Sequence, residues 1–248
     1  MGHSTYLLID LCSLIVPLLC SFDKRLKFFS KWKQWLPAIL LPMVIFIPWD
    51  IYFTEQRVWG FSPEYLIGVN ALGIPIEEWL FFICIPYACL FTFAALATLE
   101  RSTPKPLVGR LSLALFAIGL ALVGFFGLPR WYTASAFLMA AFVLFLWISN
   151  KSAPYRKTFF FGLLIILIPF TIVNGILTGL EFFHYPILSE MTSVTEEVVW
   201  YSADHHLGWR LFSIPIEDMA YALSLLGLNF LIYSLLGQRQ PSLNRVMV

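Results

Sequence analysis

Two short stretches, GIPIEEWLFF at 73–82 and SIPIEDMAYA at 213–222, begin apolar segments with the same pattern of proline, isoleucine and two acids. Acidic side chains in the first turn stabilise any helix through its dipole, which would explain a single copy. An ionisable group at the edge of a hydrocarbon layer is costly, however, and usually has a function. Because the pattern occurs twice, we interpret its four acids as functional residues. They are Glu77, Glu78, Glu217 and Asp218.

The composition predicts an integral membrane protein. Of the 248 residues, 59% are hydrophobic and 12% are charged, whereas soluble domains carry about 25% charged residues. The apolar residues form long blocks, each able to cross a hydrocarbon layer of about 30 Å. We predict an all-α polytopic fold with seven transmembrane helices, at 5–21, 36–52, 77–99, 108–126, 131–149, 158–179 and 215–237.

The basic residues predict the orientation in the membrane. Of the 16 lysines and arginines, 13 lie on one side of a seven-span arrangement: Lys24, Arg25, Lys27, Lys31, Lys33, Arg101, Lys105, Arg110, Lys151, Arg156, Lys157, Arg239 and Arg245. Loops rich in these residues stay in the cytoplasm, so we expect a cell (inner) membrane protein with its N-terminus outside and its C-terminus inside. No basic segment precedes the first apolar run, so we expect a retained span rather than a cleaved signal peptide.

The residues upstream of the two acidic motifs also correspond. IPWDIYFT precedes the first motif and TIVNGILT precedes the second, so Asp50 matches Asn174 and Thr54 matches Thr178. Two parallel three-span units need one additional span between them, because three spans reverse the direction of the chain. We therefore predict a first repeat at 1–105, a linker span at 106–129 and a second repeat at 130–248.

Carboxyl groups at a lipid boundary suit acid–base chemistry on an apolar substrate. Carboxyls that stay protonated near neutrality donate protons, and ionised neighbours accept them. Aromatic faces stabilise cations by about 0.5–2 kcal/mol each, so rings near the motifs could line the path of a carbocation, although aromatic residues also collect at membrane interfaces. The aromatic candidates are Trp49, Trp59, Phe81, Phe82 and Tyr221.

The signals for metal and disulfide sites are weak. His205 and His206 lie in an outer loop with other acids and histidines, but their spacing matches no metal site, and we interpret them as exposed loop residues. The four cysteines lie in or beside predicted spans and are interpreted as small apolar residues. We therefore expect no metal site, and a net charge of +1 gives no reason to expect a nucleic-acid partner.

Several stretches together resemble the lycopene cyclase family of small integral membrane proteins. These are IPWDIYFT, VWGFSPEYLIGVNALGIPIEEWLFFICIPYACLFTF, IPFTIVNGILTG and HHLGWRLFSIPIEDMAY. The signature Pro-x-Glu-(Glu/Asp) of that family is matched at 75–78 and 215–218, and the resemblance covers roughly 36–95 and 160–235. In this family, two three-span subunits are either separate or fused through an extra span. No phytoene synthase region, as in the fungal fusions, is expected after the second repeat.

The resemblance implies that the protein cyclises the linear ends of lycopene to β-rings, giving β-carotene. The four acids would form the acid–base set, while Asp50 and Asn174 would orient them or hold a water. No GxGxxG fingerprint appears, so we expect no flavin or other cofactor. The partners implied are the lipid-dissolved carotenoid, membrane lipids and, by association, other enzymes of carotenoid synthesis.

Alternatives come from other classes. A seven-span retinal protein needs a lysine in its last span, and 215–237 contains none. A proton-coupled transporter also has acids near helix ends and repeated units, but several predicted spans nearly lack the polar residues of a pore. A cyclase or hydratase of another carotenoid, such as a C50 chain, would use the same acid chemistry. A structural subunit of a carotenoid-synthesis complex would leave the acids unexplained.

Overall fold

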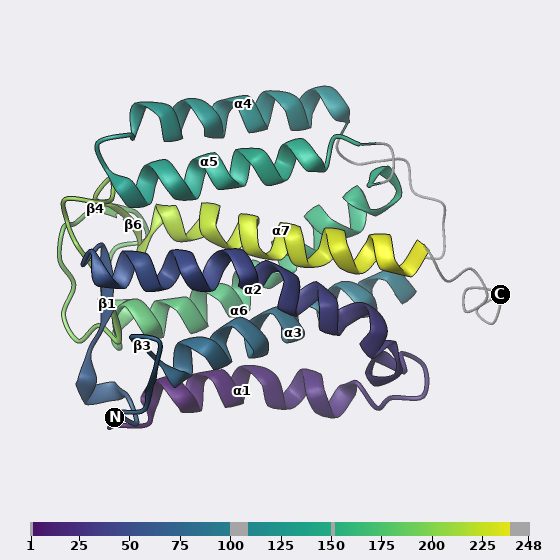
Figure 1. The fold of residues 1–248 in the computed structure, drawn as a ribbon, viewed down its shortest axis with the longest axis horizontal. Helices are drawn as coiled ribbons and strands as arrows, with labels where there is room; N and C mark the ends of the chain where they lie inside the picture. Colours follow the sequence, from purple (N-terminus) through teal and green to yellow (C-terminus); the bar gives the residue numbers. More distant parts are fainter. Residues whose placement is uncertain (1, 100–108, 150–151, 239–248) are drawn as a thin grey trace.

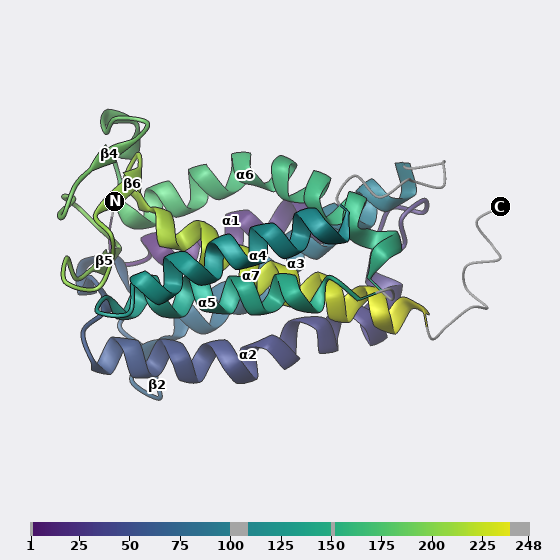
Figure 2. The same ribbon diagram turned by 90° about the horizontal axis from the view of Figure 1, so that it is seen from above.

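The computed structural model describes residues 2–99, 109–149 and 152–238. This part of the chain forms seven α-helices that run side by side (Figures 1 and 2). They are α1 (Thr5–Cys20), α2 (Trp32–Glu55), α3 (Ile76–Leu99), α4 (Arg110–Phe126), α5 (Trp131–Leu146), α6 (Arg156–Thr178) and α7 (Ile216–Gln238). Each helix overlaps one predicted span, so the prediction of a helical fold is confirmed.

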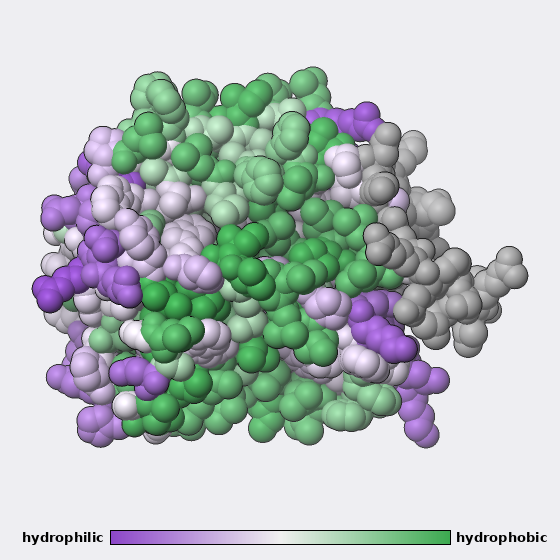
Figure 3. Space-filling model, in the orientation of Figure 1, coloured by the Kyte–Doolittle hydropathy of each residue, from purple (hydrophilic) through white to green (hydrophobic). Residues whose placement is uncertain are grey.

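The helices differ in length. By length and apolar composition, α2 with its preceding turn, α3, α6 and α7 can each cross a membrane. The helices α1, α4 and α5 have 16 or 17 residues, which corresponds to about 24–26 Å and is shorter than a hydrocarbon layer of about 30 Å. Figure 3 shows apolar side chains over the middle of one face and hydrophilic side chains toward its two ends. The apolar helices indicate a membrane protein, while the count of seven spans stays a prediction.

The two helices that follow the acidic motifs lie at the centre of the bundle. α3 and α7 contact each other, α1 and α6 pack on α3, and α2 and α5 pack on α7. α4 packs on the outer side of α5, at the top of Figure 1. The starts of α3 and α7 therefore come together at one end of the bundle.

Short strands and turns cover this end, where the chain begins (Figure 1). The strands are β1 (Trp59–Phe61), β2 (Asn70–Ala71), β3 (Ile74–Pro75), β4 (Ser189–Glu190), β5 (Val199–Tyr201), β6 (Trp209–Leu211) and β7 (Ile214–Pro215). The single 3-10 turns are η1 (Phe28–Lys31), η2 (Pro63–Tyr65), η3 (Ala153–Tyr155) and η4 (Phe182–His184), of which η2 and η4 belong to this cap. These strands were not predicted, because two or three residues are too few to show an alternating pattern.

The cap joins the two halves of the chain. β1 pairs antiparallel with β5, with Trp59 opposite Tyr201. The hairpins β2–β3 and β6–β7 lead directly into α3 and α7, so that each Pro-Ile-acid-acid motif begins as a strand and continues as a helix. Leu72 and Phe212 occupy corresponding turn positions with φ of 54° and 56°, a left-handed conformation that is uncommon for side chains other than glycine. The two motifs thus enter their helices through the same backbone geometry.

Two sequence predictions fall partly outside the described residues. One is the repeat boundary at 105/106. The other is the orientation, because five of the basic residues that predict it are not described: Arg101, Lys105, Lys151, Arg239 and Arg245. The basic loop between α1 and α2 is described, and it lies at the opposite end of the bundle from the strands (Figure 1). Its placement is the one expected if the strands and loops of the cap face outward.

Candidate active site

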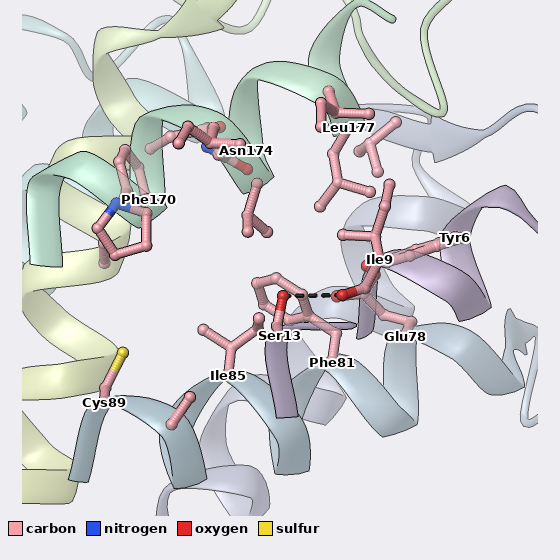
Figure 4. Close-up of a pocket in the computed structure, with 18 of the residues that line it drawn as sticks. Tyr6, Ile9, Ser13, Glu78, Phe81, Ile85, Cys89, Phe170, Asn174 and Leu177 are labelled. Atoms are coloured by element: carbon pink, nitrogen blue, oxygen red, sulfur yellow. Dashed lines mark hydrogen bonds between the residues drawn. The ribbon is translucent and has the colours of Figure 1, made fainter. Parts of the chain in front are cut away.

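A cavity of about 730 Å³ lies beneath the cap, with walls from α1, α3, α6 and α7. This volume is typical of small-molecule sites. In Figure 4, Phe170 and Asn174 of α6 lie across the cavity from Phe81 and Ile85 of α3. Most of the wall is apolar, and its carboxyl, amide and phenol groups lie toward the cap. These groups belong to Tyr6, Asp50, Glu78, Tyr132, Asn174, Tyr201, Asp218 and Tyr221.

Glu78 reaches the cavity from the first turn of α3 and is 8% exposed. Its Oε2 accepts a hydrogen bond of 2.5 Å from the Tyr6 hydroxyl. The carboxyl of Asp50, from α2, is close enough to interact electrostatically with Glu78. Asp50 accepts a bond of 2.6 Å at Oδ1 from Trp59 Nε1, and its Oδ2 has no partner among the described residues. Glu78 and Asp50 are therefore two neighbouring buried carboxyls with few donors, an arrangement suited to holding a proton.

Asp218 occupies the corresponding place on α7, but it is surrounded by donors. Tyr132 donates to its Oδ1, while Asn174 Nδ2 and the Tyr201 hydroxyl donate to its Oδ2 at 2.6 and 3.1 Å. Burial and the neighbouring Asp218 carboxyl raise the pKa of Tyr201, so this phenol stays a donor. Since an ionised carboxylate only accepts hydrogen bonds, three donors favour Asp218 as the carboxylate.

Glu77 and Glu217 point away from the cavity and bind the cap. Glu77 Oε1 accepts a bond of 2.7 Å from the Ile67 amide. Glu217 Oε1 accepts bonds from the Leu207 amide at 2.7 Å and from Thr133 Oγ1 at 2.6 Å. Both glutamates are fully buried and lie outside the cavity wall. Successive side chains on a helix point about 100° apart, so the first acid of each motif anchors a loop while the second faces the cavity.

The other predicted site residues also divide into those that line the cavity and those that lie behind its wall. Trp59, Phe81 and Tyr221 line the cavity, as do Asp50 and Asn174.

The remaining candidates lie outside the cavity wall. Trp49 packs behind Tyr221, with ring centroids 5.1 Å apart. Phe82 is fully buried in the core. Thr178 Oγ1 donates to the Asn174 carbonyl at 2.8 Å, and the Thr54 hydroxyl is buried without a partner in the described ranges. Thr178 thus bonds to the backbone of a wall residue, and Trp49 packs against the ring of another.

Tyr6, Tyr132 and Asp10 were not predicted as site residues. Tyr6 and Tyr132 occupy similar places at the starts of α1 and α5, and each donates to the second acid of one motif. A comparison of the first spans of the two halves could have found this pair. Asp10 is fully buried in α1, one turn from Tyr6, and interacts electrostatically with Glu77. A lone acid inside an apolar run was the available signal.

One histidine prediction is wrong. His206 is 1% exposed rather than an exposed loop residue, and its Nδ1 accepts a bond of 2.9 Å from the Gly208 amide. Burial, followed by the charge of Arg210, lowers the pKa of His206 to about 4. Arg210 is itself fully buried, where it donates to the Ser213 carbonyl and lies 3.7 Å from Glu197. The side chains of His206 and Arg210 are thus buried within the cap, and the sequence pattern of the loop carried no sign of this burial.

Comparison with known proteins identifies the family. A family model described as Lycopene cyclase matches residues 3–96 and 129–236, which is most of the chain. The chain belongs to the lycopene cyclase family. The resemblance expected from the acidic motifs is therefore confirmed. The family model does not cover α4 of this lycopene cyclase family member.

Similar curated proteins are bifunctional lycopene cyclase/phytoene synthases of fungi. That of Neurospora crassa is 44% identical over 41 residues, covering 16% of this chain and 7% of the relative. That of Aspergillus oryzae is 36% identical over 56 residues, covering 23% and 10%. That of Aspergillus niger is 31% identical over 107 residues, covering 38% and 18%. The chain thus matches less than a fifth of the length of these relatives. No solved structure matches the chain.

Proposed function

We propose that this lycopene cyclase family member converts the linear ends of lycopene to β-rings, with no net redox change. The observation that carries the proposal is the placement of Glu78 and Asp218, the second acids of the two motifs, at one end of an apolar cavity. The names of the fungal relatives support lycopene as the substrate. An apolar wall suits a hydrocarbon, and two carboxyls with different surroundings suit acid followed by base.

Glu78 is the proposed acid and Asp218 the proposed base. Glu78 gives its proton to the terminal double bond of the substrate, which leaves a tertiary carbocation. A neighbouring double bond attacks this cation, forming the ring bond and moving the positive charge into the ring. Asp218 then removes a ring proton, and the electrons of that bond form the ring double bond. Every proton added is matched by one removed, so the reaction is an isomerisation. The three donors around Asp218 and the proximity of Asp50 to Glu78 support this order.

The aromatic wall stabilises the cation. Trp59, Phe81 and Tyr221 line the cavity beside the two acids, and aromatic faces attract cations by about 0.5–2 kcal/mol each. The indole N–H of Trp59 is already bonded to Asp50, so the ring has a fixed orientation. Glu77 and Glu217 are proposed positioning residues, because each bonds to a cap loop while the residue after it faces the cavity.

The architecture proposed with this function is two parallel three-span repeats joined by α4. The corresponding hairpins, loop anchors and tyrosines of the two halves support the repeat, and the gap in the family match at α4 supports a linker. Seven spans would place the cap and the acids on the outer side of the cell membrane, with the N-terminus outside. The names of the fungal relatives, which combine two activities, support association with other enzymes of carotenoid synthesis.

Expression in cells that accumulate lycopene tests the proposal. We expect extracted pigments to change from lycopene to cyclic carotene, and Glu78→Gln to abolish the change at an unaltered membrane level. Glu55→Gln is the matched control, since Glu55 is an exposed acid at the end of α2 on the same side of the bundle. Unchanged lycopene with well-inserted protein would contradict lycopene as the substrate, and a C50 carotenoid would be tested next. Proton-coupled transport would then be the remaining alternative.

A further inference from the structure

We propose that the opening between α1 and α6 is the entrance through which a linear polyene slides in from the lipid. In this arrangement, one end of the molecule reaches the acids while the rest stays in the opening. This inference rests on the proposed function for the identity of the occupant. The position of the opening comes from the packing of the helices and the exposure of the cavity wall.

The first observation is that the cavity reaches the side of the bundle between these two helices. α1 and α6 each pack on α3 but make few contacts with each other. Leu8 and Val16 of α1 belong to the cavity wall, yet they are 54% and 63% exposed. Ile172 of α6 also belongs to the wall and is 46% exposed. A side chain that both lines a cavity and is exposed marks the mouth, so the mouth has one side on each helix.

The second observation is the shape and chemistry of the space behind the mouth. The wall follows α3 from Glu78 to Thr92, a distance of about 21 Å at 1.5 Å per residue. Close to the cap it ends at the acids, and farther along it is lined by apolar residues such as Ile166 and Phe170. An elongated apolar space with acids at one end fits a long hydrocarbon that enters end first. It does not fit a compact polar solute.

The third observation is that the cap covers the acidic end from above. β1 pairs with β5 across it, and Trp59 and Val199 from these strands belong to the wall. A hydrocarbon dissolved in the bilayer would not have to pass through this cap or through water. Covering the acids also keeps water away from a carbocation. Because the acids lie at one closed end, a single terminus of the polyene reacts at each visit, and the molecule must leave and reverse before the other terminus can react.

Two cysteines of α1 provide a matched chemical test. Cys12 and Cys20 are both exposed, but only Cys12 lines the cavity. The Cys20→Ala protein keeps Cys12 as its exposed α1 thiol, and the Cys12→Ala protein keeps Cys20. Each would be reacted with N-ethylmaleimide in detergent micelles, with and without lycopene, and the labelled protein measured by mass spectrometry. We expect bound lycopene to slow labelling of Cys12 about tenfold and to leave labelling of Cys20 unchanged.

A bulky side chain at the mouth provides the second test. Cys12→Trp should lower kcat/KM for lycopene about tenfold, because Cys12 is exposed on the cavity wall and an indole there would clash with the passing substrate at a cost comparable to that of overpacking. Leu11→Trp is the control, since Leu11 is 47% exposed on the neighbouring position and is not part of the cavity wall. Its kcat/KM should stay near that of the wild type.

The outcomes separate the entrance from the proposed function. If the wild type converts lycopene, while Cys12 labels equally fast with and without it and the two tryptophan variants have equal kcat/KM, the function stands and the entrance is wrong. If lycopene is neither converted nor protects Cys12, the proposed function fails, and the proposed occupant fails with it. Protection of Cys12 without conversion supports the entrance and contradicts cyclisation.

Discussion

Replacing Asp218 with asparagine should remove catalysis while keeping the fold. Asparagine has the same shape, but it lacks the charge and the basicity needed to take a ring proton. A positioned general base contributes about 10²–10⁴ in rate, so we expect kcat to fall by a factor in that range. The decrease should be in kcat rather than in KM, because the apolar wall that holds the substrate is unchanged.

The cost in stability can be derived from the hydrogen bonds. Asp218 accepts three bonds in the native protein, from Tyr132, Asn174 and Tyr201. The two phenols can rotate to accept from the new amide, so what is lost is mainly the assistance of the negative charge. Bonds to charged groups contribute about 1.5–3 kcal/mol and neutral ones about 0.5–1.5 kcal/mol. We therefore expect a loss of about 1–3 kcal/mol, and each kcal/mol lowers the melting temperature by about 2–4 °C for a chain of this size.

Glu217→Gln is the matched variant. Glu217 also accepts bonds from more than one donor, Leu207 and Thr133, but it lies outside the cavity wall. Its stability loss should be similar, while it should keep at least about a tenth of the wild-type kcat, below the effect of a general base. Both variants would be assayed as purified protein with lycopene in micelles, alongside thermal unfolding. Equal losses of kcat in the two variants would refute the division of roles between the acids of a motif.

Three further predictions concern the tyrosine donors of the site, Asp10 and Glu197. Tyr6→Phe removes the hydrogen bond that the Tyr6 hydroxyl donates to Glu78 and should lower kcat about tenfold. Tyr132→Phe leaves Asp218 two donors and should lower kcat less, so the reverse order of the two kcat values in pigment kinetics would be evidence against the proposal. Asp10→Asn should leave the melting temperature unchanged or raise it, because both Asp10 oxygens are buried without a partner in the described part of the chain and a neutral group costs less to bury than a charged one. A clear fall in the melting temperature would contradict this reasoning. Burial raises the pKa of Glu197 to about 7 against the opposing effect of Arg210, so its folded form binds a proton more tightly than the unfolded form does. The stabilisation that protonated Glu197 gives the folded protein is therefore full below pH 4.5 and is lost as pH rises through about 7. Glu197→Gln should flatten the plot of melting temperature against pH over this range. Identical plots for the wild type and the variant would contradict the raised pKa of Glu197.

Local patterns in the sequence were sufficient for the helices and for most of the acidic site. Apolar runs predict the seven helices because a membrane-buried segment must satisfy its backbone internally. The repeated motif pointed to Glu78 and Asp218, and the matching upstream stretches pointed to Asp50 and Asn174, all four of which line the cavity. Each of these signals lies within a few residues of the group that it identifies.

The division of labour within each motif was decided only by the tertiary structure. Adjacent acids look alike in sequence, yet Glu77 meets the Ile67 amide while Glu78 meets the cavity, because the helix rotates successive side chains apart. Tyr6 was likewise invisible as a partner of Glu78, since they lie in different helices and are joined only when α1 packs on α3. The entrance between α1 and α6 has no sequence signal at all, because it arises from two helices that share a neighbour and barely touch each other.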